Sequence, residues 1–570
     1  MFIFEHLLEL DRHPGKPLGE LSLDDVRALL EGAASVCENE LRPVNLSADR
    51  IGSQLTGAGA VTAPGLKQAY GALRDGGWIG LQSDPAFGGP GMPNVIAKAV
   101  HEMRAAASMA VAGFAELTEA VCLALERFGT DAQKAVYLPH LASGAWGGAM
   151  HLTEPQAGSD IGLIRARAVR AEDGSYRLSG SKIFISNAEQ DLTENVVNLV
   201  LARIDGARPG VKGLSLFLVP RFLPDEAGGP GARNGLRYIS LEHKMGLHGS
   251  VTGTIVYEDA VGFLVGNENE GLKPLFTMVN ETRLGVGLQG LAAAAAASQA
   301  AIAYAHERRQ GKAPGSMGDG PDALIAHADV RRMVLTMSSF VEGGRALAAW
   351  VALQMDLAGK GDAKAARAVN LMTPLIKAFF TDEGFATADL ALQLHGGHGY
   401  IRETGVEQFL RDVRVTRLYE GANGIIAFDL SRRKVIADDG EAIAEVIATM
   451  RGDLARAGLA GIDAAQYLSA ALDDLDAATR ALLRLSTGAP HRIGAVAVDY
   501  LRLFGLCALG WIWLKTLAAI QGDCGLPAEE TARKQARAAF YLRWQLTETA
   551  TLARRVAMPA EDFSFLDTGV

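Results

Sequence analysis

The sequence predicts an α+β fold that is mainly α-helical, and three observations support this. A chain of 570 residues is too long for a single hydrophobic core. Apolar residues recur at helical spacing through most of the chain, and only between about 149 and 265 do short runs alternate between apolar and polar residues. We therefore expect four domains: a helical one over 1–148, a β domain over 149–265, and two more helical domains over 266–437 and 438–570.

Helix-start signals support the first helical domain. The segment "SLDDVRALLEGAASVCENEL" opens with Ser22 and two aspartates, which suit an N-cap and the positive end of a helix dipole. The segment "GTDAQKAVYLPHLASG" offers Thr130 or Asp131 as a cap and reaches a stop signal at Gly144.

The β domain is predicted from its alternating runs and one hairpin signal. The runs are "RARAVRAEDGSYRLSGSKIFIS", "VVNLVLARI", "GLSLFLVP" and "GTIVYEDA". The Asp173-Gly174 step favours a tight turn between two strands, because glycine tolerates the positive φ that such turns need.

From about residue 270 long helical patterns return, with expected breaks at Gly311 to Gly320 and at "HGGHGY". The segment "GVGLQG", Gly285 to Gly290, matches the GxGxxG dinucleotide signature by its letters. That signature requires a preceding strand, and the flanking sequence is helical on both sides. We interpret these glycines as positions where two helices pack closely.

The sequence contains no convincing motif for a metal site or for a catalytic nucleophile. His395 and His398 have a possible metal spacing, but they sit in a glycine-rich segment, and we expect a turn there instead of a metal site. The chain contains no G-x-S-x-G nucleophile elbow.

Composition points to a cytoplasmic protein. The net charge of -10 argues against nucleic acid as a partner, and four scattered cysteines form no disulfide pattern. The acidic N-terminus lacks the features of a signal peptide. The apolar run Leu503 to Leu514 is too short to cross a bilayer, so we expect a buried helix and no transmembrane segment.

Six segments in a fixed order carry a family resemblance. They are "HLTEPQAGSD", "GSKIFISNA", "HKMGLHGSVTGTIVYEDA", "ERRQG", "QLHGGHGY" and "RDVRVTRLYEGANGI". Over roughly residues 30 to 435 the chain resembles the FAD-dependent acyl-CoA dehydrogenase family. Within the family it is most similar to the 3-(methylthio)propanoyl-CoA dehydrogenase group, which has an extra C-terminal helical domain. The resemblance implies a middle β-barrel-like domain and a C-terminal four-helix domain.

Glu420 in "RLYEGANGI" matches the family's catalytic base. The other interpretation of this residue is a solvated side chain at a helix end. The resemblance implies that Glu420 removes the α-proton of an acyl-CoA thioester while the β-hydride passes to flavin N5, giving the trans-2-enoyl-CoA. Burial among apolar groups would raise the pKa of such a base toward neutrality.

Other roles follow from the resemblance, position by position. The residues implied to bind FAD are Thr153, Ser159, Phe184, Ser186, Arg308, Gln393, Gly396 and Gly397. Of these, the last four would reach the FAD of the neighbouring subunit, so a homodimer is expected. Arg283 and Tyr419 are the implied substrate contacts.

Four positions depart from the family pattern. Ala422 replaces a common threonine, Phe184 replaces a tryptophan, Met150 replaces an aromatic residue and His248 replaces an arginine. These changes bear on cofactor affinity and substrate preference, and none of them removes the base.

Three alternatives stay open at this point: an acyl-CoA oxidase that uses O₂, a long-chain acyl-CoA dehydrogenase, and a non-catalytic DNA-binding member of the family. Residues 441 to 570 carry 13 Lys and Arg against 15 Asp and Glu, which disfavours binding to DNA. For the dehydrogenase, the resemblance implies an electron-transfer flavoprotein as the electron acceptor.

Overall fold

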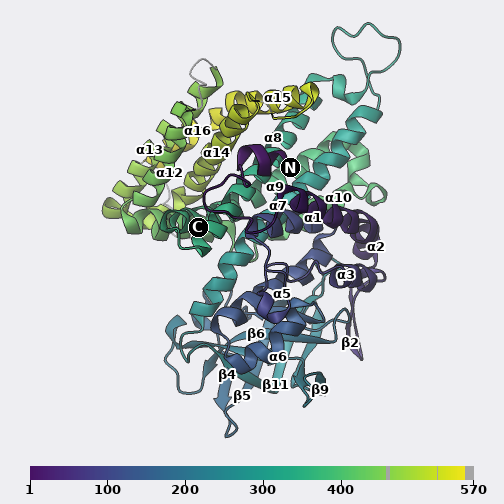
Figure 1. The fold of residues 1–570 in the computed structure, drawn as a ribbon, viewed down its shortest axis with the longest axis vertical. Helices are drawn as coiled ribbons and strands as arrows, with labels where there is room; N and C mark the ends of the chain where they lie inside the picture. The colour runs from purple at the N-terminus through teal and green to yellow at the C-terminus, as the bar shows by residue number, and fades with distance from the viewer. Residues whose placement is uncertain (457–462, 523, 559–570) are drawn as a thin grey trace, which may run out of the picture. The chain divides into compact units, whose positions relative to one another are not determined.

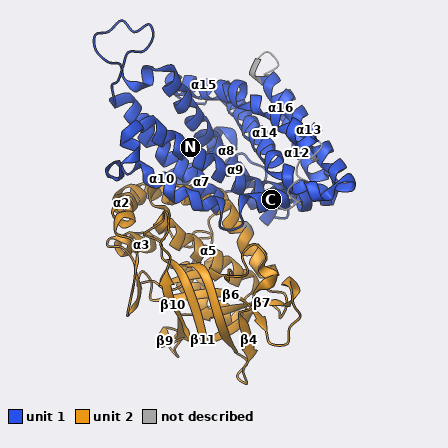
Figure 2. Ribbon diagram, turned by 180° about the vertical axis from the view of Figure 1, so that it is seen from behind, with its two compact units in different colours: residues 1–27, 286–570 blue, residues 28–285 orange. Residues whose placement is uncertain are grey.

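The structure is a computed structural model that describes residues 1–456, 463–522 and 524–558. The chain forms two compact units, coloured separately in Figure 2. Unit 2 comprises Ala28–Gly285, and unit 1 comprises Met1–Arg27 with Val286–Val570. The predicted fold class is confirmed, because helices dominate and one segment forms a β domain. The boundaries of the four predicted domains stay a prediction.

The first part of unit 2 is helical, as predicted (Figure 1). Its helices are α1 (Leu23–Val36, which begins in unit 1), α2 (Arg42–Ile51), α3 (Leu66–Asp75), α4 (Asn94–Ala107), α5 (Met109–Phe128) and α6 (Asp131–Ala142). Both predicted caps are present. Ser22 Oγ accepts from the Asp25 amide at 3.1 Å, and Thr130 forms a capping box with Gln133. A small hairpin of β1 (Gln54–Thr56) and β2 (Gly59–Val61) was not predicted.

The β domain of unit 2 is barrel-like, as the resemblance implies. Its strands are β3 (Trp146–His151), β4 (Arg167–Arg170), β5 (Tyr176–Ser186), β6 (Asn195–Ile204), β7 (Leu214–Pro220), β10 (Leu236–Leu241) and β11 (Thr252–Val265), with a separate pair β8 (Phe222–Pro224) and β9 (Pro230–Arg233). Pairing runs β11-β5-β4-β6-β7 and returns from β7 to β11, so five strands close a ring. The predicted turn at Gly174, with φ of 81°, joins β4 to β5.

Unit 1 is built on long helices. They are α7 (Leu272–Glu307, which begins in unit 2), α8 (Ala328–Gly359) and α9 (Ala363–His395), followed by the shorter η7 (Gly396–Tyr400), α10 (Val406–Val413), η9 (Arg414–Arg417) and α11 (Asn423–Asp429). The predicted breaks at Gly311 to Gly320 and at "HGGHGY" separate these helices. The "GVGLQG" segment lies inside α7, so its interpretation as a helix-packing site is confirmed. A Cβ on Gly287 would lie 2.6 Å from Ile376, and one on Gly290 would lie 2.6 Å from the Phe380 carbonyl, both on α9.

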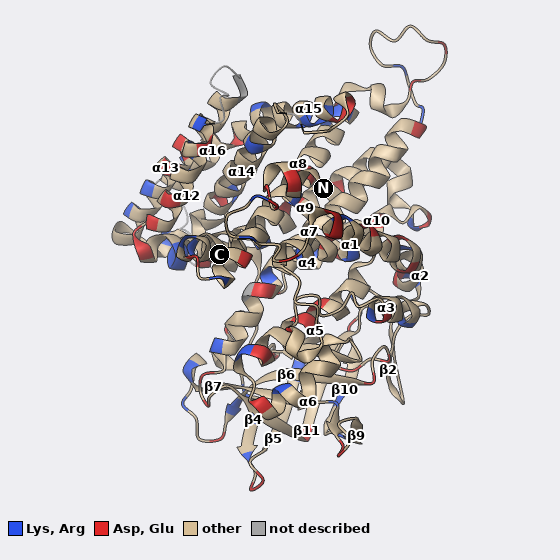
Figure 3. Ribbon diagram, in the orientation of Figure 1, with Lys and Arg blue, Asp and Glu red and all other residues tan. Residues whose placement is uncertain are grey.

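The last helices of unit 1 form a bundle around α14 (Ile493–Ala519). The others are α12 (Glu441–Arg456), α13 (Asp463–Gly488), α15 (Ala528–Trp544) and α16 (Thr549–Ala557). Acidic and basic residues both occur on these helices (Figure 3).

The predicted buried helix at Leu503 to Leu514 is confirmed, but the argument from its length was wrong. The run is part of a 27-residue helix, which continues past Arg502 on one side and past Lys515 on the other. By length and composition alone, two stretches could cross a membrane: Leu272–Glu307 and Pro490–Ala519. In each, 72% of the apolar window is buried inside the protein, as is common for core helices of a large domain.

Candidate active site

Glu420 lies in a short turn between η9 and α11 and is half-buried. Its φ is 52°, and that of Gly421 is 101°. A non-glycine residue rarely adopts a positive φ, so the surrounding structure must hold it there. The preceding residue, Tyr419, donates a hydrogen bond from its hydroxyl to Gln289 on α7. This bond ties the turn to α7 on one side.

Helix α9 holds the other side of the turn. Lys377 Nζ donates to the Gly421 carbonyl at 2.6 Å and to Asn423 Oδ1 at 2.8 Å. Asn423 Nδ2 in turn donates to Asp382 Oδ1 at 2.9 Å, and the same oxygen accepts from Arg417 Nε at 2.5 Å. The residues on both sides of Glu420 are therefore bonded to α9.

In unit 2, three of the residues predicted to bind FAD gather at one end of β5. The Ile183 amide donates to the Thr153 carbonyl at 2.9 Å, which places Thr153 beside Phe184. Phe184 has a φ of 57° and is 62% exposed, so its ring is available to a planar ligand. Ser186 Oγ hydrogen-bonds Thr252 Oγ1 at 2.9 Å. Ser159 lies exposed in the loop that follows Thr153.

A buried ion pair supports that loop. Lys182 and Glu154 are 0% and 3% exposed, and Nζ lies 2.8 Å from Oε1. Glu154 also accepts the amides of Arg165 and Ala166 at 2.7 and 2.9 Å. Lys182 donates to the Leu152 carbonyl at 2.9 Å, directly before Thr153. The pair therefore fixes both ends of the loop that carries Thr153 and Ser159.

In unit 1, the other four predicted FAD residues lie in neighbouring segments. Arg308 follows α7, and Gln393, Gly396 and Gly397 lie at the end of α9. Tyr304 connects the two segments, because its ring stacks on His395 at 4.5 Å between centroids. All four predicted residues are exposed. Gly396 has a φ of 59°, which the sharp end of α9 requires.

The two histidines of "HGGHG" have structural partners. His395 Nδ1 bonds the Ala391 carbonyl at 2.7 Å, and His398 Nδ1 bonds the Tyr304 hydroxyl at 3.2 Å. Among the residues that the structure describes, no group of three His, Cys, Asp or Glu side chains is arranged to hold a metal ion.

The structure brings the predicted residues together in three places, and their roles stay predictions. These places are the Glu420 turn with Tyr419, the β5 end with Thr153, Phe184 and Ser186, and the α9 end with Arg308. Arg283 lies on the part of α7 that belongs to unit 2, so its link to Glu420 stays a prediction.

Sequence reasoning missed the residues that hold these places: Lys377, Asn423, Asp382, Lys182 and Glu154. One signal for Lys377 was available. It is the only charged residue within the apolar run "LMTPLIKAFF" of a helix, where a lysine needs a specific partner.

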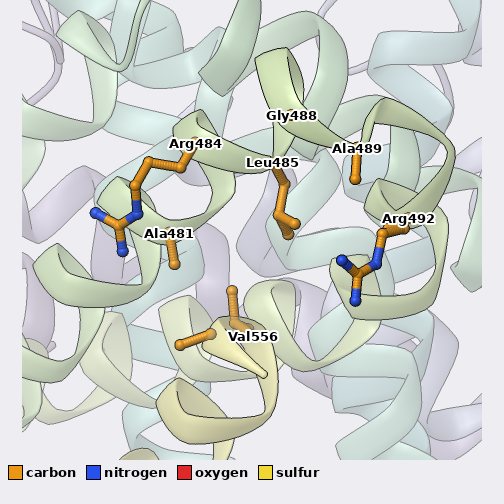
Figure 4. Close-up of a pocket in the computed structure, with 8 residues that line it drawn as sticks. Ala481, Arg484, Leu485, Gly488, Ala489, Arg492 and Val556 are labelled. Carbon is orange, nitrogen blue, oxygen red and sulfur yellow. The ribbon is translucent and has the colours of Figure 1, made fainter. Parts of the chain in front are cut away.

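A cavity of about 320 Å³ lies in the C-terminal helical bundle (Figure 4). Residues of α13, α16 and the turn before α14 line it, including Arg484, Leu485, Arg492 and Val556. None of the predicted site residues lines this cavity, so it is separate from the candidate active site.

The chain matches four family models in sequence order. Residues 24–145, 149–260 and 269–435 match the N-terminal, middle and C-terminal domains of acyl-CoA dehydrogenase. Residues 442–566 match an acetyl-CoA dehydrogenase C-terminal-like domain.

Similar proteins agree with these matches. The chain is 42% identical to 3-methylmercaptopropionyl-CoA dehydrogenase of Ruegeria pomeroyi, over 91% of this chain and 90% of the relative. It is 35% identical to the broad-specificity linear acyl-CoA dehydrogenase FadE5 of Mycobacterium tuberculosis, over 84% and 82%. The fold resembles that of an FAD complex of acyl-CoA dehydrogenase from Bacillus anthracis, with a TM-score of 0.76 at 20% identity over 99% of this chain and 93% of that one.

Proposed function

Because this chain belongs to the acyl-CoA dehydrogenase family, we propose that it oxidises an acyl-CoA thioester to the trans-2-enoyl-CoA with Glu420 as the base. The enzyme class and the cofactor follow from the family: the protein is an FAD-dependent oxidoreductase. When bound, FAD accepts the hydride that leaves the β-carbon. The remaining chemistry is the removal of the α-proton, which a positioned carboxylate can perform.

The observation that supports Glu420 most directly is its backbone. A φ of 52° at Glu420, held between bonds to α7 and α9, keeps the carboxylate on a rigid turn. Strained residues of this kind are concentrated at functional sites, because the surrounding contacts have to maintain them. A solvated glutamate at a helix end would need none of these anchors.

The described residues fit FAD. The exposed ring of Phe184 offers a flat apolar face, and Thr153 and the hydroxyl of Ser186 lie at the same end of β5. Arg308 and the glycine turn at Gly396 and Gly397 offer a charge and open backbone to a phosphate group. We propose that these residues hold the cofactor, with the second group acting on the FAD of a partner subunit in a homodimer.

For the substrate, the relative that is 42% identical supports 3-(methylthio)propanoyl-CoA or a related short- or medium-chain acyl-CoA. The relative named for broad specificity on linear acyl-CoA supports straight-chain substrates as well. We propose an electron-transfer flavoprotein as the acceptor. All four cysteines are free and buried, which supports a soluble protein of the reducing cytoplasm.

The test is an anaerobic titration of the purified protein with 3-(methylthio)propanoyl-CoA and with butanoyl-CoA. We expect the flavin absorbance to bleach in the wild type but not in Glu420→Gln. Glu403→Gln, which changes an exposed glutamate in the same way, is the control and should bleach like the wild type. For each substrate, the rate of flavin bleaching is divided by the substrate concentration that gives half of the maximal rate. The substrate with the higher ratio is the preferred one. Equal bleaching in Glu420→Gln would contradict the assignment of the base. Rapid reoxidation of the reduced flavin by O₂ would instead favour an acyl-CoA oxidase.

A further inference from the structure

Lys377 is a buried lysine in the middle of α9, and its side chain is 0% exposed. An ammonium group loses its hydration when it is buried, so such a lysine persists only where specific acceptors replace the lost water. Two of the acceptors of Lys377 belong to the turn that carries Glu420: the Gly421 carbonyl at 2.6 Å and Asn423 Oδ1 at 2.8 Å. A buried charge is therefore directed at the turn of the proposed base.

Asn423 strengthens the same connection. Its Nδ2 atom lies within hydrogen-bond distance of three acceptors on α9: the Ala378 carbonyl at 3.2 Å, Thr381 Oγ1 at 2.9 Å and Asp382 Oδ1 at 2.9 Å. With Lys377, these contacts cover a little more than one turn of α9. The short segment from Gly421 to Asn423 is thus attached to a rigid helix through several bonds.

Glu420 directly precedes this attached segment. Its positive φ and that of Gly421 define the direction in which the carboxylate leaves the backbone. If Gly421 were free to rotate, Glu420 could relax to an ordinary negative φ, and its carboxylate would turn away. The bond from Lys377 to the Gly421 carbonyl opposes this relaxation, because it fixes the orientation of the peptide group that follows Gly421.

We infer that Lys377 is a positioning residue for Glu420, and that its ammonium group holds the turn in the geometry needed for α-proton removal. The inference rests on the proposed function of Glu420. Lys377 exchanges no proton with the substrate and acts through the backbone of Gly421 and the side chain of Asn423. If Lys377 only stabilised unit 1, its substitution would lower the stability of the protein. The rate of α-proton removal by the molecules that remain folded would not change.

The test compares Lys377→Met with Thr373→Val. Methionine keeps the length of the side chain and removes all donors. Thr373 lies one turn earlier on α9, is 4% exposed and donates to the Val369 carbonyl of its own helix at 2.8 Å. Two quantities are measured per flavin-loaded molecule: steady-state turnover, and exchange of the substrate α-proton with D₂O after the flavin has been reduced. The exchange reports on the base without hydride transfer.

For Lys377→Met we expect exchange and kcat to fall together by about 100-fold, with KM changed by less than about threefold, since misplacement of a catalytic group by about 1 Å has effects of this size. Thr373→Val should match the wild type. Lys377→Gln, which keeps a neutral donor, should recover part of the loss. If Lys377→Met exchanges α-protons at the wild-type rate, the inference is overturned, whatever happens to its thermal stability.

If Lys377→Met does not fold, Asn423→Ala provides the second test, with an expected fall of about tenfold in exchange at unchanged KM. A wild-type rate in that variant would equally overturn the inference. Glu420→Gln separates this outcome from failure of the proposed function. If Glu420→Gln exchanges α-protons as fast as the wild type, the base itself has been misassigned and the positioning role of Lys377 fails with it.

Discussion

Lys182 and Glu154 form an ion pair across the β domain that is almost completely removed from solvent, with 2.8 Å between Nζ and Oε1. The pair holds the loop that begins at Thr153, so the loop that we propose to bind flavin depends on a charge balance inside the protein. Burial lowers the pKa of Lys182 to about 8, while Glu154 acts in the opposite direction. The loss of either side chain would therefore leave an uncompensated charge in the protein interior.

Lys182→Met should destabilise the protein by about 3–5 kcal/mol and reduce its flavin content, because it leaves the buried Glu154 carboxylate without its counter-ion. Thermal unfolding and the ratio of flavin to protein absorbance measure the two effects. Arg170→Met is the matched control. It removes a pair with Glu268 in which the side chains are 57% and 32% exposed, and it should cost less than about 1 kcal/mol. Equal costs for the two variants would contradict the role of burial.

Acid should release the flavin and destabilise the protein through His151 at the end of β3. Burial, together with the nearby Lys182, lowers the pKa of His151 from 6.5 to about 3. Between these values the unfolded chain binds a proton that the folded protein does not, so stability falls as pH decreases from 6.5 toward 3. At pH 5 the loss from this group is about 2 kcal/mol relative to neutral pH.

Unfolding free energy and flavin fluorescence measured from pH 7.5 to 4.5 check this dependence. His151→Asn keeps a polar partner for the Tyr257 hydroxyl and has no group that titrates in this range. Its stability should be lower at neutral pH but should change less between pH 7 and 5. A variant that keeps the full wild-type pH dependence would show that another group is responsible.

Tyr419→Phe distinguishes two roles for the tyrosine beside the base. The Tyr419 hydroxyl donates to Gln289, so its removal should loosen the turn and lower kcat by about tenfold without a change in KM. A rise in KM at constant kcat would show instead that the hydroxyl contacts the substrate. Gln289→Leu removes the other partner, and the two substitutions combined should cost less than the sum of the separate effects.

Close packing of α14 on α9 should make Gly505 intolerant of substitution. A Cβ at Gly505 would collide with the Phe379 ring, so Gly505→Ala should cost about 1–3 kcal/mol as the helices separate. At Gly452 on α12, a Cβ would meet only the tip of Arg456 at 3.8 Å. Gly452→Ala should therefore be neutral or stabilise the protein by up to about 1 kcal/mol. Chemical denaturation of both variants measures the difference, and a neutral Gly505→Ala would contradict the packing.

Much of the fold was predictable because its signals are local. The caps at Ser22 and Thr130 and the turn at Gly174 depend on residues only a few positions apart, and such patterns survive in any tertiary context. The helical setting of the "GVGLQG" glycines was predictable for the same reason. The length of α14 was not, because Arg502 and Lys515 bound the apolar run in the sequence but do not end the helix.

The sequence by itself determined the order of helical and β segments and, through its motifs, the family and the position of the proposed base. The tertiary structure alone decided what surrounds that base. Lys377 reaches Gly421 across 44 positions of the chain, and Lys182 reaches Glu154 across 28. No local pattern encodes these bonds, because they form only when packing brings distant segments together and excludes water from the charges between them.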